Sequence, residues 1–152
     1  MEEKMKAIVP KEMIFLDEVV ASRNEAIHYL VKKAGEAGLV TDTSDLEVAV
    51  LAREEEISTA VGYQVAMPHG KSEAVNRPFI GFLRLKDLMK WNGSDEVKLI
   101  FLIAVPKSNV DNVHLRFIAQ LSKNLLDDEF RSFIAEENDK EKIYRFFQAI
   151  KF

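Results

Sequence analysis

The sequence predicts an α/β sandwich, in which helices flank a central mixed β-sheet on both faces and residues 1–152 form a single domain. Helical periodicity marks the beginning and the end of the chain, and short apolar or alternating segments typical of strands occupy the middle. One of these segments, Leu99 to Val105, is apolar at every position, as in a central strand covered on both faces. The length of 152 residues suits one compact domain with one core.

Two helices are expected first, because each has a start signal. Ser22 to Glu25 and Ser44 to Glu47 both have the Ser-x-x-Glu form of a capping box, whose side chains satisfy the free amides of a helix start. Apolar residues follow the first box at helical spacing, and Gly35 and Gly38 offer places for that helix to end. Arg53 falls near the end of the second helix, close to the side that faces the core.

The middle of the chain is expected to form the sheet. Turn residues, among them Pro68-His69-Gly70 and Asn92 to Asp95, separate short apolar or alternating segments. The predicted strands are Ile14 to Leu16, Val61 to Met67, Phe79 to Leu85 and Leu99 to Val105.

Three helices are expected at the end. Their N-caps are predicted at Asn112 or Asp111, at Asp127 or Asp128, and at Asn138 or Asp139. His114 lies at the start of the first of them and in line with its apolar stripe, which contains Ile118, Leu121 and Leu125.

Composition narrows the function classes. The formal net charge of -4 gives no electrostatic reason to expect nucleic acid or an anionic membrane as a partner. The chain has no cysteine, which rules out disulfides, thiolate catalysis and sulfur-bound zinc and fits a reducing compartment. No apolar stretch of the signal-peptide type follows the charged first six residues, and the apolar run up to Val105 is too short to span a bilayer. We therefore expect a soluble cytoplasmic protein.

Three histidines are candidates for chemistry, and His69 is placed best. It lies between Pro68, which fixes the chain, and Gly70, which leaves the approach open. A neutral imidazole is nucleophilic at one ring nitrogen while a hydrogen bond holds the other. By position alone, a loop histidine in a tight turn is the commoner case. His28, in the middle of the first helix and off its main apolar stripe, is expected at the surface.

His114 and Arg53 are weaker candidates when each is taken alone. A histidine in the apolar stripe at a helix start is more often a core-edge residue, although such a start also offers free amides and a favourable dipole to an anion. An arginine beside Glu54, Glu55 and Glu56 is usually in a surface ion pair, although a guanidinium can also clamp two phosphoryl oxygens.

Other chemistries lack their motifs. Two histidines and a carboxylate can hold zinc or iron, but no His-x-His or His-x-x-x-His spacing brings such ligands together on one element. The chain has no glycine-rich phosphate loop for a nucleotide and no nucleophile elbow for a serine hydrolase. The residues alone therefore indicate a histidine site and leave its reaction open.

The segment from Leu51 to Lys71 closely resembles the signature of the fructose/mannitol-type IIA domains of the bacterial phosphoenolpyruvate-dependent sugar phosphotransferase system (PTS EIIA type 2). In that family an Arg-Glu-Glu helix end leads to a strand end of the Ala-Ile-Pro-His-Gly-Lys type, whose histidine is phosphorylated. Trp91, the apolar strand up to Pro106 and the helix start at His114 extend the likeness over nearly the whole chain.

The resemblance implies a phosphoryl relay that needs no metal or nucleotide cofactor. His69 would be the phosphoacceptor, His114 would orient the phosphoryl group, and Arg53 would offset its charge. The group would come from the histidine phosphocarrier protein (HPr) and pass to the IIB domain of a sugar permease. The protein would therefore associate with a membrane permease without inserting into the membrane. Because both partners must approach the histidine, we expect an exposed site ringed by apolar residues, with Met67, Val61 and Tyr63 as candidates.

The resemblance leaves two points open. Ala60 and Gln64 stand where the family often has glycine, which can alter the loop there and the surface offered to partners. IIA-like proteins of the nitrogen-related branch use the same phosphohistidine as a regulatory mark. A signalling protein that binds targets according to the phosphorylation state of His69 is therefore the alternative to sugar transport. A scaffold that is never phosphorylated is disfavoured, because His69, His114 and Arg53 are all present.

Overall fold

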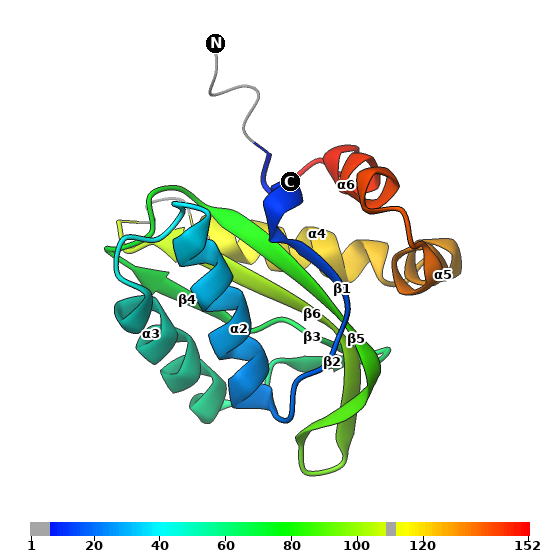
Figure 1. The fold of residues 1–152 in the computed structure, drawn as a ribbon, viewed down its shortest axis with the longest axis horizontal. Coiled ribbons are helices and arrows are strands. Elements are labelled where there is room, and N and C mark those ends of the chain that lie inside the picture. The colour runs from blue at the N-terminus through cyan, green and yellow to red at the C-terminus, as the bar shows by residue number, and fades with distance from the viewer. Residues whose placement is uncertain (1–6, 109–111) are drawn as a thin grey trace.

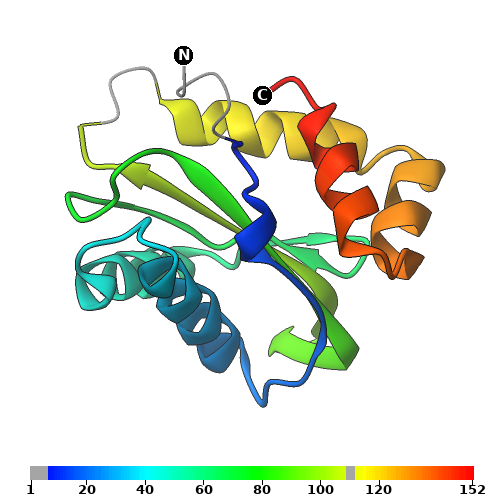
Figure 2. The ribbon, with the colours of Figure 1, turned by 45° about the horizontal axis from the view of Figure 1, so that its top comes forward.

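The computed structural model describes residues 7–108 and 112–152, in which one six-stranded mixed sheet lies between two layers of helices (Figure 1, Figure 2). Helices α2 (Arg23–Glu36) and α3 (Thr43–Glu56) cover one face of the sheet. Helices α4 (Val113–Asn124), α5 (Asp128–Glu136) and α6 (Lys140–Gln148) cover the other. The predicted fold class is confirmed. In these residues, no helix is long and apolar enough to cross a membrane.

The sheet is built around a long antiparallel hairpin of β5 (Phe79–Asn92) and β6 (Asp95–Pro106). β1 (Ile14–Glu18), which follows the 3-10 turn η1 (Lys11–Met13), pairs in parallel with β5 at one edge. On its other side β6 pairs in parallel with two short consecutive strands, β3 (Val65–Ala66) and β4 (His69–Ser72). β2 (Ala60–Gly62) completes the sheet by pairing antiparallel with β3. β4 therefore lies directly beside β6, a strand buried over most of its length.

The region from Ala60 to Ser72 differs from the prediction. Val61 to Met67 do not form one strand, because the chain turns at Tyr63 and Gln64, whose φ angles are +56° and +63°. This left-handed region is the one that glycine adopts most easily, which explains why glycine suits the position of Gln64. Strand β4 was not predicted, because Pro68-His69-Gly70 has the composition of a turn.

The helix starts follow most of the predicted signals. Ser22, Asp127 and Asp139 cap α2, α5 and α6, and the side chain of each accepts a backbone N–H. These are the residue types whose short oxygen-bearing side chains satisfy the free amides of a first turn.

The other two predicted caps differ from the structure in position or in hydrogen bonding. α3 begins one residue after Asp42, whose carboxylate accepts the N–H of Asp45 at 3.2 Å, so Ser44 lies inside the helix. Asn112 precedes α4 with a φ of +51° and makes no capping hydrogen bond with its side chain. Asp111, the alternative cap, lies outside the described residues.

The buried apolar residues form two clusters, one on each side of the sheet, where a single core was expected. Ile100, Leu102 and Ala104 of β6 pack toward α2 and α3, and Phe101 and Ile103 pack toward α4, α5 and α6. β6 is thus covered on both faces, as predicted. Because burying one such side chain contributes about 1.5–3 kcal/mol, packing on the sheet is the main attachment of both helix layers.

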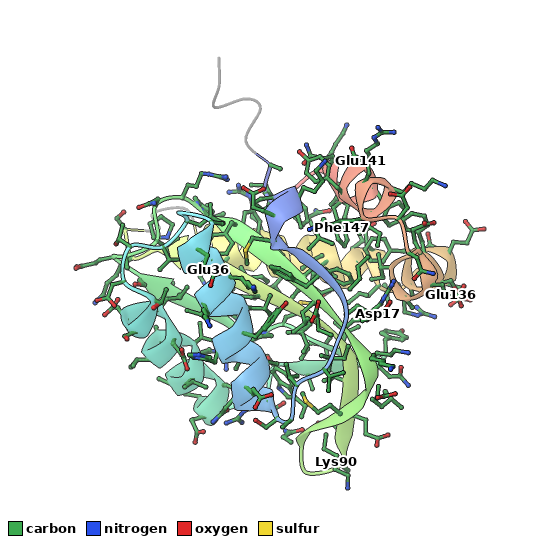
Figure 3. The ribbon with its side chains drawn as sticks, in the orientation of Figure 1. Asp17, Glu36, Lys90, Glu136, Glu141 and Phe147 are labelled. Carbon is green, nitrogen blue, oxygen red and sulfur yellow. The ribbon has the colours of Figure 1, made fainter. Side chains whose placement is uncertain are left out.

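A charged residue is buried beneath the α5–α6 connection. Arg84 of β5 is 1% exposed and pairs with Asp17 at 3.0 Å. Its guanidinium also donates to the carbonyls of Ile134 and Glu137, at 3.2 and 2.7 Å, and to Oδ1 of Asn138 at 3.0 Å. Figure 3 shows Asp17 at the edge of the sheet that lies next to α5. These hydrogen bonds tie β1 and β5 to the C-terminal helices.

Candidate active site

His69 is the first residue of β4, and the alternation of side chains along the strand fixes its direction. Gly70 and Ser72 are buried on the α3 side, whereas His69 is half-buried and Lys71 exposed on the opposite face. A Cβ atom at Gly70 would lie 2.8 Å from Cγ2 of Val50 and 3.1 Å from its backbone nitrogen. Gly70 therefore allows α3 to pack closely on β4.

A backbone hydrogen bond selects the tautomer of His69. Its Nδ1 lies 2.9 Å from the carbonyl oxygen of Met67. Because a carbonyl oxygen only accepts, Nδ1 carries the proton and the lone pair of the neutral ring is on Nε2. The ring is thus held as a nucleophile at Nε2.

The surroundings of His69 keep its ring neutral. Burial lowers the pKa of His69 below the ordinary 6.5, and the positive charge of Arg53 lowers it further. The hydrogen bond to Met67 and the charges of Glu54 and Glu56 raise this pKa, but the net shift is downward. At neutral pH the Nε2 atom is therefore unprotonated.

His114 lies beside His69, as the resemblance implied. The two ring centroids are 6.0 Å apart and the ring planes meet at 31°. His114 is in the first turn of α4 and is half-buried. Burial lowers its pKa, and the positive charges of Lys71 and His69 lower it further. β4 and α4 therefore bring two imidazole rings together, both with lowered pKa values.

Arg53 approaches the histidines from the last turn of α3. Its Nη1 donates to the carbonyl of Ile57 at 2.9 Å, and its charge is close enough to lower the pKa of His69. The expected surface ion pair with the neighbouring glutamates is not what the structure shows. Glu55 pairs instead with Arg23, at 3.0 Å. In the described residues, Arg53 is thus held near His69 by a backbone hydrogen bond and not by a neighbouring glutamate.

Sequence reasoning missed two charged groups near the histidines. Lys71 shares a face of β4 with His69 and lowers the pKa of His114. Lys71 lies two residues after His69, and this spacing would have placed it on the same face if β4 had been predicted as a strand. Glu54 is only 3% exposed. Its burial has no local signal in a run of three glutamates.

Of the three candidates for the expected apolar ring, one is buried and two are exposed. Met67 is buried in the cluster beneath α4, α5 and α6, so its side chain does not line the site. Val61 and Tyr63 are 46% and 50% exposed, and the ring of Tyr63 lies 4.2 Å from the guanidinium of Arg131. His28, expected at the surface, is exposed and pairs with Glu47 of α3.

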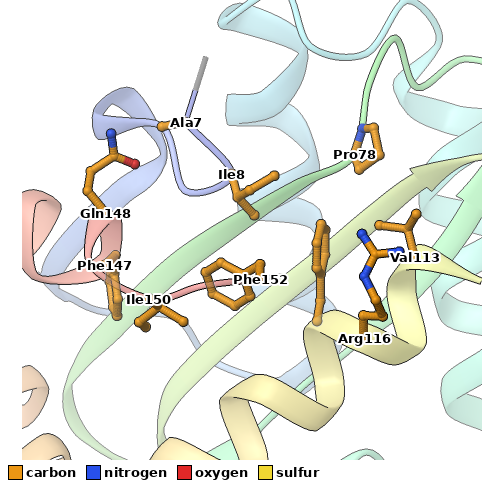
Figure 4. Close-up of a pocket in the computed structure, with 10 residues that line it drawn as sticks. Ala7, Ile8, Pro78, Val113, Arg116, Phe147, Gln148, Ile150 and Phe152 are labelled. Carbon is orange, nitrogen blue, oxygen red and sulfur yellow. The ribbon is translucent and has the colours of Figure 1, made fainter. Parts of the chain in front are cut away.

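A cavity of about 430 Å³ lies between the start of α4 and the C-terminal residues, with Phe117, Phe147, Phe152 and Arg116 in its wall (Figure 4). None of the three predicted site residues lines it. Within residues 7–108 and 112–152, no group of three His, Cys, Asp or Glu side chains could hold a metal ion.

Sequence comparisons identify relatives along nearly the whole chain. The family described as "Phosphoenolpyruvate-dependent sugar phosphotransferase system, EIIA 2" matches residues 7–150. The PTS system fructose-specific EIIA component of Haloferax volcanii is 33% identical over 141 residues, which are 91% of each chain. The 2-O-alpha-mannosyl-D-glycerate-specific EIIABC component of Escherichia coli is 30% identical over 131 residues. Those residues are 84% of this chain and 20% of that longer protein.

Solved structures share the fold. Nitrogen regulatory protein IIA-Ntr from Neisseria meningitidis superposes with a TM-score of 0.81 at 25% identity, over 92% of this chain and 96% of that one. IIA mannitol from Escherichia coli gives 0.77 at 24% identity, over 91% and 98% of the two chains. An Escherichia coli complex of enzyme IIA mannitol with phosphorylated IIB mannitol gives 0.77 at 24% identity, over 91% and 96%. With the family match spanning residues 7–150, the chain belongs to the EIIA 2 family of the phosphoenolpyruvate-dependent sugar phosphotransferase system.

Proposed function

We propose that this chain carries a phosphoryl group on Nε2 of His69, accepting it from HPr and passing it to a IIB component during sugar uptake. The observation that carries the proposal is the His69 ring, whose Nδ1–H is bound by Met67 and whose pKa is lowered. A ring in this state has a nucleophilic Nε2 at neutral pH. The neighbouring charge of Arg53 and ring of His114 fit an incoming phosphoryl group.

In the proposed transfer, the lone pair of Nε2 attacks the phosphorus of the donor phosphohistidine in line. A bond from phosphorus to Nε2 forms as the bond to the donor nitrogen breaks, and the donor nitrogen keeps the bonding pair. His69 loses no proton, because Nδ1 holds its hydrogen on the carbonyl of Met67 throughout. Arg53 offsets the charge of the phosphoryl oxygens and His114 orients them, so positioning and charge supply most of the catalysis.

The proposed partners rest on the relatives. The mannosyl-glycerate relative is an EIIABC component, and the IIA protein of the mannitol system forms a complex with phosphorylated IIB. HPr is proposed as donor, since the Escherichia coli relatives include multiphosphoryl transfer proteins. We assign residues 1–152 to one EIIA domain and place it in the cytoplasm, where the absence of cysteine fits a reducing compartment.

Phosphoryl transfer from labelled phosphoenolpyruvate through enzyme I and HPr tests the proposal. The wild-type chain should acquire an acid-labile, base-stable label, and His69→Ala should acquire none. His28→Ala, which changes an exposed histidine on α2, should be labelled like the wild type. An unlabelled wild type in the presence of phosphorylated HPr would overturn the proposal.

The likeness to IIA-Ntr favours a second candidate, a regulatory protein that binds targets according to the phosphorylation of His69. The two functions differ in what happens to the phosphoryl group. Rapid loss of the label to an added IIB domain from a related permease would support sugar transport. Label that stays on the chain while IIB remains unlabelled would support the regulatory function.

A further inference from the structure

Glu54 is a buried carboxylate to which the phosphoryl relay assigns no role. Its Oε2 accepts the N–H of Thr59 at 2.7 Å and the indole N–H of Trp91 at 2.9 Å. Its Oε1 accepts the hydroxyl of Thr59 at 2.6 Å. A buried carboxylate is costly unless hydrogen bonds compensate it, and here three donors do so.

These hydrogen bonds lead from Glu54 to the imidazole of His69. Thr59, which Glu54 holds through its N–H and its hydroxyl, accepts the N–H of Met67 on its own carbonyl at 3.0 Å. The carbonyl of Met67 then accepts Nδ1–H of His69 at 2.9 Å. A continuous chain of hydrogen bonds therefore runs from Trp91 on β5, through the buried carboxylate, to the ring of His69.

The same carboxylate fixes the end of α3. Arg53 precedes Glu54 in the chain, and its Nη1 donates to the carbonyl of Ile57. Ile57 lies within the short segment that the hydrogen bonds between Glu54 and Thr59 close. One anchor therefore constrains both the imidazole of His69 and the guanidinium of Arg53.

We propose that Glu54 is a positioning residue of the phosphoryl-transfer site, which holds Nδ1–H of His69 on the carbonyl of Met67 and so aims Nε2 and Arg53 at one phosphoryl group. This role rests on the proposed function of His69. The carboxylate also acts through its charge. When Nε2 bonds phosphorus and Nδ1 keeps its proton, the imidazole ring becomes positive, and the nearby negative charge stabilises it.

Two substitutions separate position from charge. Glu54→Gln keeps the shape, because the amide oxygen can accept from Thr59 and Trp91 while the amide nitrogen donates to the hydroxyl of Thr59. Glu54→Ala removes the anchor of the hydrogen-bond chain. Thr59→Val removes only the hydroxyl bond and tests the same role if Glu54→Ala fails to fold. Glu55→Gln is the matched control, because Glu55 is exposed and pairs with Arg23.

Nuclear magnetic resonance of isotope-labelled histidine gives the tautomer and pKa of His69 in each variant. The charges of Arg53, Glu54 and Glu56 on α3 act on the pKa of His69, the ring of His114 on α4 lies 6.0 Å away, and the charge of Lys71 on β4 acts in turn on His114. In Glu54→Ala, and less so in Thr59→Val, we expect a mixture of tautomers and phosphorylation slowed on the order of tenfold or more. Glu54→Gln should keep the Nδ1–H tautomer and most of the rate, but lower the pKa of His69, because the charge of Glu54 raises it.

The outcomes distinguish this inference from the proposed function. A single Nδ1–H tautomer with an unchanged rate in Glu54→Ala would overturn the positioning role. An unchanged pKa of His69 in Glu54→Gln, or an equal shift in Glu55→Gln, would overturn the role of charge. The spectra can be recorded without phosphorylation. If the variants gave the expected spectra but the wild type acquired no phosphoryl label from HPr, the proposed function would be overturned, whereas the role of Glu54 in holding the His69 ring would be supported.

Discussion

The two helix ends that flank His69 are built in opposite ways. The last turn of α3 is closed by hydrogen bonds, with Arg53 bound to a backbone carbonyl, and Gly70 lets this helix contact β4. The first turn of α4 has no acidic residue, and Asn112 before it adopts a left-handed conformation without a side-chain cap. Substitutions at the end of α3 should therefore disturb the positions of several site residues at once. Substitutions at the start of α4 should remove one contact each, such as the contact of His114 with the phosphoryl group.

The largest effect should come from the charge on α3. Arg53→Met should slow phosphorylation on the order of 100-fold, as expected when one preorganised charge that stabilises a transition state is lost. Arg53→Lys should restore only part of the rate, because an ammonium group lacks the planar fork with which a guanidinium can hold the carbonyl of Ile57 and bind two oxygens side by side. Labelled transfer from HPr measures both variants. A wild-type rate in Arg53→Met would show that this helix end serves the fold alone.

Close packing of α3 on β4 should have the next largest effect. Gly70→Ala should lower the free energy of unfolding by about 2 kcal/mol, because its Cβ would meet the backbone as well as the side chain of Val50. Gly81→Ala is the control, since its Cβ would meet the end of the flexible Met13 side chain at 2.9 Å. Denaturant unfolding compares the two. Equal losses of unfolding free energy in the two variants would mean that the contact between α3 and β4 adjusts to an added methyl group as easily as the Met13 side chain does.

On the α4 side, His114→Ala should slow phosphorylation about tenfold, the loss expected for one hydrogen bond to a charged group. Unfolding should change little, because His114 is half-buried in a first turn. Leu115→Ala, at the exposed neighbouring position, should leave the rate unchanged and serves as the control. If His114→Ala slowed phosphorylation as much as Arg53→Met does, the two helix ends would not differ in their effect on the site.

The smallest effect is expected at Lys71. Lys71→Met should raise the pKa of His114, because the ammonium charge lowers it in the wild type. The rate should fall only about twofold, since Lys71 is exposed and exposed charges contribute little. Titration of His114 by nuclear magnetic resonance measures the shift. Lys123→Met, in the last turn of α4, should leave the pKa of His114 where it is.

Periodicity predicted each α-helix of the described residues, because each buries one regular stripe against the sheet, and capping signals placed the starts of α2, α5 and α6. They did not predict β4, since Pro68 and Gly70 are typical of turns. This strand forms because β6 lies beside it: the carbonyl of Pro68 accepts the N–H of Ile103 at 3.0 Å, and pairing continues from His69 to Ser72. Pairing with a distant strand leaves no mark in the local composition.

The family resemblance, more than the residue patterns, singled out the candidate site residues. No spacing rule connects His69 with His114, and only the fold brings their rings to 6.0 Å. The burial of Glu54 was missed for a related reason. The indole of Trp91, which compensates its charge, comes from a position 37 residues further along the chain.

Arg84 couples the C-terminal helices to the opposite end of the chain. Its buried guanidinium is satisfied only while Asp17 of β1 and the carbonyls of Ile134 and Glu137 are all in place. Separating them would leave a buried cation without partners, at a cost of about 3 kcal/mol or more. The backbone amides of β1, α5 and α6 should therefore exchange with solvent as one cooperative unit, and the two ends of the chain should open together.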